Sequence, residues 1–345
     1  MPLLEVKNLN VSFGINNAKT RIVNDVSFAV ERGKTLALVG ESGSGKSVSA
    51  MSILRLLDKN GSIDSGEILF QENENEAPMD LMKLSLKQMQ AVRGNKISVV
   101  FQEPMTALNP VLTVERQLCE PLRIHRSLSK AKAREQAQKK LAEVQIPAPE
   151  RVLKAYPHTL SGGMRQRVMI AMALACQPKL LIADEPTTAL DVTVQAQILS
   201  LMKTLQEQNG AAILFITHDL GVVNEMADDV AVMYAGQIME LSKKSSVFYR
   251  GAYSHPYTEG LLRSIPTQKT AGKRLECIRG NVPSPKNLPK GCKFAPRCRY
   301  CTQKCVDEEP PLFTTKSGQK IRCFYPKKEA RQSDEHAKLT LDQGA

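Results

Sequence analysis

The chain has 345 residues, of which 42% are hydrophobic, so it can bury one large α/β core with a smaller appendage and is not disordered throughout. Its formal charge of +12 suits either nucleic acid or an anionic membrane surface. Trp is absent and aromatic residues are only 5%, which argues against the stacking platforms of single-strand binders, and we expect no nucleic-acid partner. The longest nearly uninterrupted apolar run, residues 168–176, is far shorter than the roughly 20 residues that cross a bilayer. The N-terminus has no targeting pattern, so we expect a cytosolic protein.

The N-terminal part begins with predicted strands. Short apolar runs in the first 35 residues alternate with Asn, Gly and charged turns, which predicts an antiparallel β layer. Residues 34–39 form a short predicted buried strand, residues 40–45 are rich in glycine, and residues 46–57 have a helical composition. The order is therefore strand, glycine loop, helix.

The middle of the chain predicts helices inserted into an α/β core. A polar run at 71–76 is expected to be an exposed loop, and residues 97–102 return to a strand. Between residues 113 and 146 the apolar positions recur at helical spacing amid Lys, Arg, Glu and Gln. We expect a helical subdomain at about residues 103–175.

Two further buried strands, residues 180–183 and 212–216, flank a predicted helix at 193–208. This βαβ order is typical of a parallel sheet. From residue 265 onward Pro and Gly become frequent and most of the cysteines appear, which predicts a small separate module. The predicted regions are a main domain at 1–264, the cysteine-rich module at 265–326 and a polar, disordered tail at 327–345.

Residues 40–47 have the spacing of a phosphate-binding loop: Gly40, Glu41, Ser42, Gly43, Ser44, Gly45, Lys46 and Ser47. Glycines in such a loop let backbone N–H groups point at phosphate oxygens while a helix N-terminus faces them. We expect Lys46 to neutralise charge on the β- and γ-phosphates and Ser47 to bind Mg²⁺. The predicted strand before the loop and the predicted helix after it support this interpretation.

Asp184 and Glu185 follow the apolar run of a predicted buried strand. At the end of that strand Asp184 can hold Mg²⁺, and Glu185 can orient or deprotonate an attacking water. An isolated acidic pair could equally be a solvated strand end. In a chain that also carries a phosphate loop, the pair predicts nucleotide hydrolysis.

The order of three motifs resembles an ABC-type ATPase. The phosphate loop is followed by Leu160-Ser161-Gly162-Gly163-Met164 and then by Asp184-Glu185. The resemblance implies a P-loop ATPase domain with a RecA-like core, an antiparallel β layer and an inserted helical subdomain. It also implies that two such domains clamp two ATP molecules head to tail. Ser161, Gly162 and Gly163 would then donate hydrogen bonds to the γ-phosphate held by the partner's loop.

Four further residues match functional positions of that family. Gln102 resembles the glutamine that senses Mg²⁺ and links to the membrane subunit, and Asp191 resembles the aspartate of the D-loop. His218 follows a predicted buried strand and resembles the catalytic switch histidine. Phe13 resembles the aromatic residue that stacks on adenine, although an apolar strand residue can also be plain core.

Longer stretches narrow the resemblance. Residues 39–47, 101–110 and 183–193 are similar to the dipeptide, oligopeptide and nickel importer ATPases, and the similarity covers about residues 3 to 325. That family implies two membrane permease subunits, an extracytoplasmic binding protein and a second, related ATPase that completes a heterodimer. The chain is then expected on the cytoplasmic face of the inner membrane, where it drives peptide uptake. Nickel or another small solute is the alternative cargo.

Two other classes share the motifs. Soluble ABC ATPases of translation or DNA repair carry two cassettes or a long coiled coil, whereas this sequence has one cassette and no sustained heptads. Exporter ATPases also share the hydrolytic motifs. The longer stretches favour the importer.

Five of the eight cysteines lie between residues 292 and 323. In a reducing cytosol such crowding indicates metal or redox chemistry rather than disulfides. Cys292, Cys298, Cys305 and Cys323 resemble the C-terminal cysteine motif of the peptide importers and predict a [4Fe–4S] cluster. Structural Zn²⁺ is the alternative, but zinc sites usually present cysteines two to four residues apart, and such pairs here all need Cys301.

Overall fold

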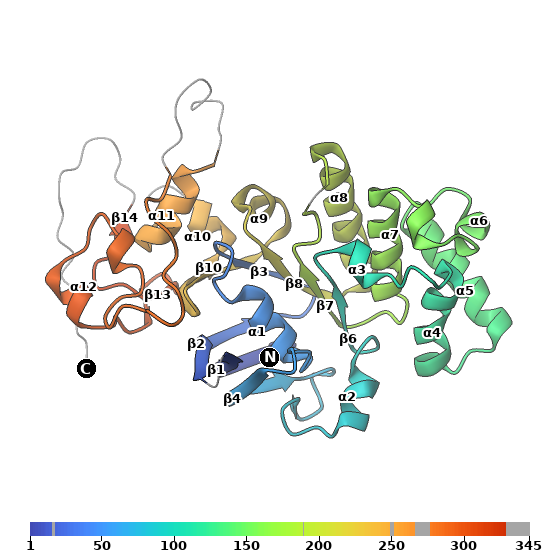
Figure 1. The fold of residues 1–345 in the computed structure, drawn as a ribbon, viewed down its shortest axis with the longest axis horizontal. Helices are drawn as coiled ribbons and strands as arrows, with labels where there is room; N and C mark the ends of the chain where they lie inside the picture. Colours follow the sequence, from blue (N-terminus) through green and yellow to red (C-terminus); the bar gives the residue numbers. More distant parts are fainter. Residues whose placement is uncertain (16–17, 189, 249–251, 266–276, 329–345) are drawn as a thin grey trace.

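The computed structural model describes residues 1–15, 18–188, 190–248, 252–265 and 277–328 (Figure 1). Two main β-sheets, the helices packed on them and a helical arm make up most of the fold. Within the described ranges, no helix combines the length and the apolar character that crossing a bilayer requires.

The N-terminal strands form an antiparallel sheet in the order β2-β1-β4-β5, which confirms the predicted β layer. Val6 and Leu9 on β1 are both buried although their spacing breaks the alternation of a strand. A register shift lies between them, where Asn8 takes a φ of 48° in the left-handed region that Asn tolerates. The strands are β1 (Leu4–Ile15), β2 (Ala18–Val30), β4 (Gly61–Phe70) and β5 (Met79–Asp80).

The second sheet has eight strands in the order β12-β13-β10-β9-β3-β8-β7-β6. The five strands from β9 to β6 in this order pair in parallel, and β3, β7 and β8 are buried along their whole length. Burial on both faces explains why these strands are continuous apolar runs. Their bounds are β3 (Thr35–Val39), β6 (Ile97–Val100), β7 (Leu180–Asp184), β8 (Ala212–Thr217), β9 (Asp229–Tyr234) and β10 (Gln237–Lys243).

Helices cover both faces of the central strands. α1 (Lys46–Ile53) contacts both sheets, and α8 (Val192–Asn209) and α9 (Leu220–Met226) lie on the opposite face (Figure 1). α8 connects the parallel strands β7 and β8, which confirms the predicted βαβ unit. α1 is shorter than predicted because the chain turns after Leu54, where Arg55 has a left-handed φ of 52°.

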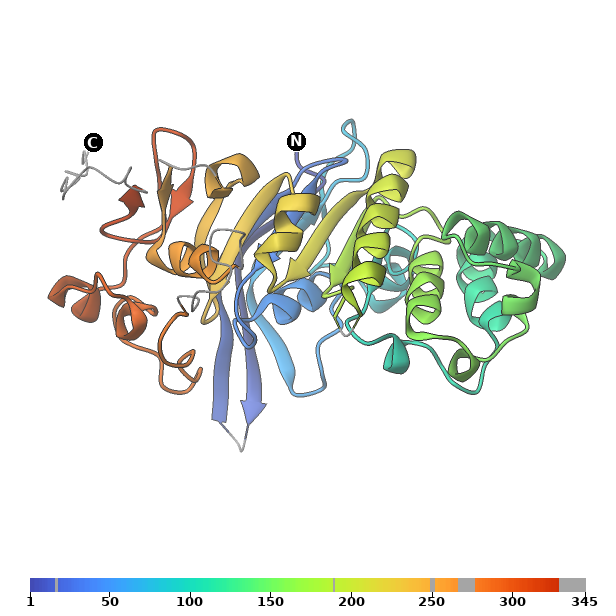
Figure 2. The same cartoon turned by 90° about the horizontal axis from the view of Figure 1, so that it is seen from above.

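A helical arm lies beside the β6 edge of the large sheet (Figure 2). Ser or Thr caps three of its helices: Thr113, Ser129 and Ser161 each accept a backbone N–H from the first turn. The arm comprises α3 (Pro104–Ala107), α4 (Val114–Arg126), α5 (Lys130–Glu143), α6 (Pro149–Leu153), the 3₁₀ turn η1 (Pro157–Thr159) and α7 (Gly162–Ala173). α2 (Leu86–Val92) precedes β6. Cys176 lies in the turn after α7.

The C-terminal segment extends the large sheet instead of standing apart from it. Ile321 on β13 pairs with Glu240 on β10, and the Phe294 ring packs against Tyr234 and Tyr257. Its elements, with those that lead into it, are α10 (Lys244–Phe248), β11 (Tyr253–Ser254), α11 (Pro256–Arg263), η3 (Ala295–Arg297), α12 (Gln303–Asp307), β12 (Phe313–Thr314), β13 (Lys320–Ile321) and β14 (Lys327–Lys328). The predicted disordered tail falls outside the described residues, apart from β14, which pairs with β11.

Candidate functional site

The loop between β3 and α1 closes around the ammonium group of Lys46. Lys46 Nζ donates to the carbonyl oxygens of Gly40 at 2.8 Å and Glu41 at 3.0 Å. Only glycine fits at position 40, since a Cβ there would lie 2.1 Å from the Met233 oxygen. Burial lowers the pKa of Lys46, and nearby carboxylates oppose this shift. The loop therefore holds a buried cation close to its backbone.

The first turn of α1 is open to an anion. The helix begins at Lys46 after Gly45, whose φ is 98° and which has no side chain to cap the free N–H groups. Unpaired N–H groups and the positive end of the helix dipole attract a phosphate group. Phosphate binding by residues 40–47 stays a prediction.

Ser47 and Asp184 meet at the same edge of the sheet. Ser47 Oγ donates to Asp184 Oδ1 at 2.9 Å, and only 6% of Asp184 is exposed. Oxygens that bind one octahedral Mg²⁺ at 2.0–2.1 Å as neighbours lie about 2.9 Å apart, so the pair fits this ion. Burial raises the pKa of Asp184, and the hydrogen bond from Ser47 opposes the shift. A cation at this point would favour the ionised carboxylate.

Glu185 collects three polar neighbours. Its Oε2 lies 3.0 Å from Thr188 Oγ1, 3.2 Å from His218 Nδ1 and 3.3 Å from Gln102 Nε2. The backbone of Glu185 has a φ of 43°, a conformation that costs a non-glycine residue roughly 1 kcal/mol or more and is concentrated at functional sites. Two predicted residues, Gln102 after β6 and His218 after β8, thus contact the carboxylate of Glu185, which follows β7.

The remaining predicted residues lie elsewhere. Ser161, Gly162 and Gly163 form the start of α7, which lies away from α1 in both ribbon views (Figures 1 and 2). Asp191 caps α8, where its Oδ1 accepts the Val194 N–H at 2.9 Å. The half-buried Phe13 ring lies against Gly61. The start of α7 and the start of α1 therefore stand apart in one chain (Figure 1).

Two neighbours of the site were not anticipated. Thr188 lies three residues after Glu185 in the sequence, so its hydroxyl could have been recognised as a possible hydrogen-bond donor to that carboxylate. Tyr257 Oη accepts the Glu41 N–H at 2.9 Å across a separation of 216 residues. No local pattern marks such a contact.

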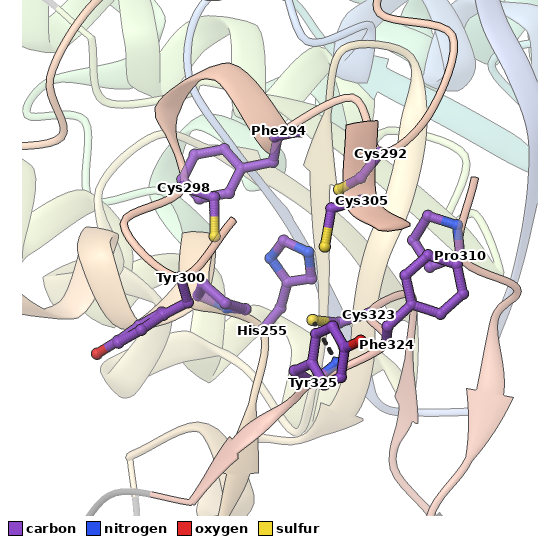
Figure 3. A pocket seen from close by; sticks show the side chains of 12 residues that line it. His255, Cys292, Phe294, Cys298, Tyr300, Cys305, Pro310, Cys323, Phe324 and Tyr325 are labelled. Carbon is purple, nitrogen blue, oxygen red and sulfur yellow. Dashed lines mark hydrogen bonds between the residues drawn. The ribbon is translucent and has the colours of Figure 1, made fainter. Parts of the chain in front are cut away.

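A second candidate site is a cavity in the C-terminal segment (Figure 3). Cys292, Cys298, Cys305 and Cys323 are among the residues that line it. Cys301 does not line the cavity and is exposed. The predicted cysteines, which come from four positions spread over 32 residues, therefore face one space.

The cavity cysteines are thiols in an apolar setting. Burial raises the pKa of Cys298 to about 11 and that of Cys323 to about 12. His255 also lines the cavity, but its Nδ1 accepts the Tyr257 N–H at 3.0 Å, so this nitrogen is not available to a metal. In the described part of the chain, no group of three or more His, Cys, Asp or Glu residues is arranged to hold a metal ion. The metal site stays a prediction.

Family profiles match two parts of the chain. The profile described as ABC transporter matches residues 23–188, and the profile described as Oligopeptide/dipeptide transporter, C-terminal region, matches residues 239–305. The second match includes Cys292, Cys298 and Cys305 and ends before Cys323.

Curated relatives match along nearly the whole chain. The oligopeptide transport ATP-binding protein AppD of Bacillus subtilis is 50% identical over 333 residues, which cover 96% of this chain and 99% of AppD. The oligopeptide transport ATP-binding protein OppD of Salmonella typhimurium is 47% identical over 327 residues, 95% of each chain. A putative peptide import ATP-binding protein of Brucella melitensis is 50% identical over 330 residues, 94% of this chain and 97% of its own length.

The fold has solved counterparts. A bacterial ABC transporter cassette solved as a dimer superposes with a TM-score of 0.61 at 28% identity, covering 70% of this chain and 98% of the cassette. The same cassette is known as a dimer in a post-hydrolysis state with ADP and phosphate. The P-loop ATPase fold is thereby confirmed, and the chain belongs to the ABC transporter ATP-binding proteins, in the family of the oligopeptide and peptide transport ATPases.

Proposed function

We propose that this chain binds and hydrolyses ATP to drive the uptake of oligopeptides or dipeptides through separate membrane subunits. The proposal rests on the meeting of four side chains at one sheet edge: Lys46, Ser47, Asp184 and Glu185. Together they are the groups that one ATPase chain contributes to phosphoryl transfer. The relatives are named for oligopeptide or peptide transport, which favours peptides over nickel as cargo.

Residues of this chain then act on the triphosphate as follows. Lys46 and the N–H groups of residues 42–47 bind the phosphate oxygens. Ser47, Asp184 and Gln102 would hold Mg²⁺, which would neutralise phosphate charge. Glu185 Oε2 accepts a proton from the water whose oxygen attacks the γ-phosphorus. The bond from that phosphorus to the bridging oxygen breaks, leaving ADP and phosphate. His218 orients Glu185 and the γ-phosphate, and Phe13 stacks on adenine.

The site is completed by a second ATPase. Ser161, Gly162 and Gly163 lie away from Lys46 of their own chain, so we assign them to the γ-phosphate on the partner's loop, with Asp191 beside the contact. The dimeric cassette of similar fold supports this arrangement. We propose a heterodimer with a related ATPase, bound to two permease subunits and served by an extracytoplasmic binding protein. The chain would lie on the cytoplasmic face of the inner membrane.

Cys292, Cys298, Cys305 and Cys323 are proposed to hold a [4Fe–4S] cluster. Four cysteines around one cavity match the ligand count, and Lys304, next to Cys305, adds positive charge. Structural Zn²⁺ on the same thiolates is the alternative, and it differs from the cluster in its metal content per chain.

Replacing Lys46 tests the ATP site. Lys46→Ala removes the phosphate counter-charge and should abolish measurable binding of a fluorescent ATP analogue and all peptide uptake by the assembled complex. Lys83→Ala is the matched control, because Lys83 is 80% exposed and pairs with Asp80 on β5. Nucleotide binding by Lys46→Ala at wild-type affinity would refute the proposed site.

A further inference from the structure

Arg297, next to Cys298, reaches from the C-terminal segment to the phosphate loop. Its side chain is only 6% exposed, and Nη1 lies 3.0 Å from both carboxylate oxygens of Glu41. The same nitrogen lies 3.4 Å from Tyr234 Oη, and Nε donates to the Arg279 carbonyl at 2.9 Å. These partners hold the buried Arg297 guanidinium in one position, and the guanidinium in turn fixes the position of the Glu41 carboxylate.

Glu41 is the second residue of the phosphate loop, and three of its groups are held. The amide N–H donates to Tyr257 Oη at 2.9 Å, and the carbonyl accepts from Lys46 Nζ at 3.0 Å. The carboxylate is bound by Arg297. Two of the three restraints come from residues more than 200 positions away, in α11 and the C-terminal segment.

Aromatic packing makes this anchor rigid. The rings of Tyr234 and Tyr257 have centroids 4.7 Å apart, and each lies 5.3 Å from the Phe294 ring. The Arg297 guanidinium lies 5.7 Å from the centre of the Tyr234 ring. Buried aromatic clusters of this kind resist rearrangement because each ring fills a shaped space.

The ion pair between Arg297 and Glu41 should affect ATP binding through the charge of Glu41. A carboxylate inside an anion-binding loop repels the triphosphate, and Glu41 is close enough to act on the charge of Lys46. Arg297 offsets that negative charge through its contact with both carboxylate oxygens of Glu41. Removing Arg297 would leave an unpaired carboxylate in the loop.

We propose that Arg297 is a positioning residue for the ATP site, which fixes Glu41 and offsets its charge so that the phosphate loop can accept the triphosphate. The inference rests on the proposed role of residues 40–47. It makes the C-terminal segment a structural part of the nucleotide site.

The test measures ATP affinity and turnover separately in the full chain assembled with its partner ATPase and permeases. Arg297→Gln should raise the Kd for ATP about tenfold at low salt, while kcat at saturating ATP stays within about twofold of wild type. Arg299→Gln is the matched control. Arg299 flanks the same cysteine and bonds Glu259 at 2.9 Å, and its loss should leave the Kd unchanged.

A second variant tests whether the Arg297 substitution acts through Glu41 or through a general loosening of the fold. Glu41→Gln removes the repelling charge, so Arg297→Gln should cause no further loss of affinity in that background. If Arg297→Gln fails to fold, Arg297→Lys keeps the charge but loses the Nε–H that donates to the Arg279 carbonyl, and its Kd should rise about threefold.

Three results would overturn the inference: a wild-type Kd in Arg297→Gln or Arg297→Lys, an equal rise in Arg299→Gln, or an undiminished effect in the Glu41→Gln background. Lys46→Ala distinguishes this failure from failure of the proposed function. If Lys46→Ala loses ATP while the Arg297 variants bind it normally, only the positioning role is wrong.

Discussion

Glu185 is the residue on which hydrolysis should depend most directly. Its carboxylate is held by Thr188, His218 and Gln102, and a side chain placed in this way can accept a proton from water. Glu185→Gln keeps the shape and removes the base, so ATP binding should persist while hydrolysis slows by on the order of 10²-fold or more.

The measurement is single-turnover hydrolysis in the assembled complex, beside an ATP-binding titration. Glu207→Gln, on the exposed face of α8, should hydrolyse ATP at the wild-type rate. Wild-type turnover in Glu185→Gln would show that another group is the base.

Candidate site residues could be picked out from the sequence where they stand next to one another along the chain. Lys46 and Ser47 stand in one eight-residue run, and Asp184 and Glu185 stand side by side at the end of one strand. The contacts of Glu41 were not predictable, because Tyr257 and Arg297 reach it only through the folded chain. Arg297 and Glu41 are 256 residues apart, so no local pattern in the sequence indicates their ion pair.

Strand β10 places a carboxyl group in the core. Glu240 is fully buried, its Oε2 accepts the His255 N–H at 2.8 Å, and burial raises its pKa to about 7 from the ordinary 4.5. The folded chain therefore holds a proton that the unfolded chain releases, so this group's contribution to stability is lost as pH rises from 4.5 through 7. His255 acts in the opposite sense: burial lowers its pKa to about 3, and its contribution is lost as pH falls below 6.5.

Glu240→Gln isolates the first effect. Relative to wild type, the variant should gain about 3 kcal/mol of unfolding free energy between pH 4.5 and 7, following 1.36 kcal/mol for each pKa unit. Denaturant unfolding at a series of pH values measures the difference. Glu67→Gln, on the exposed part of β4, should run parallel to wild type. A pH-independent difference for Glu240→Gln would contradict the buried ionisation.

Replacing Cys298 and replacing Cys301 should have different effects on the metal content of the protein. Cys298 lines the cavity and Cys301 does not, so Cys298→Ser should lose the metal whereas Cys301→Ser should keep it. Protein purified without oxygen should be brown, absorb near 400 nm and contain about four iron and four sulfide per chain. Colourless protein with one zinc per chain would contradict the cluster, and iron retained by Cys298→Ser would contradict the ligand set.

Elements with strong periodicity were predictable, and short ones were not. The buried runs of β7 and β8 and the helix between them follow from apolar pattern alone. Strand β13 has two residues and takes its place from pairing with β10, so the sequence suggested a separate module where the structure has a continued sheet. Register imposed by a distant strand is a tertiary effect.

The whole molecule provides one half of each proposed ATP site. The start of α7 and the phosphate loop lie apart in one chain, so a complete site needs a second cassette (Figure 1). The family of the chain could be inferred from its motifs and is confirmed by the relatives.

The most direct test of the account is the ATPase rate of this chain alone and in vesicles with the second ATPase, both permeases and the binding protein. The isolated chain should hydrolyse ATP slowly, with a rate per chain that rises with concentration. The complete complex should be faster and should take up peptide in proportion to ATP hydrolysed, and Glu185→Gln should slow both by on the order of 10²-fold or more. Full, concentration-independent turnover by the isolated chain, or peptide uptake at the wild-type rate in Glu185→Gln, would contradict the account.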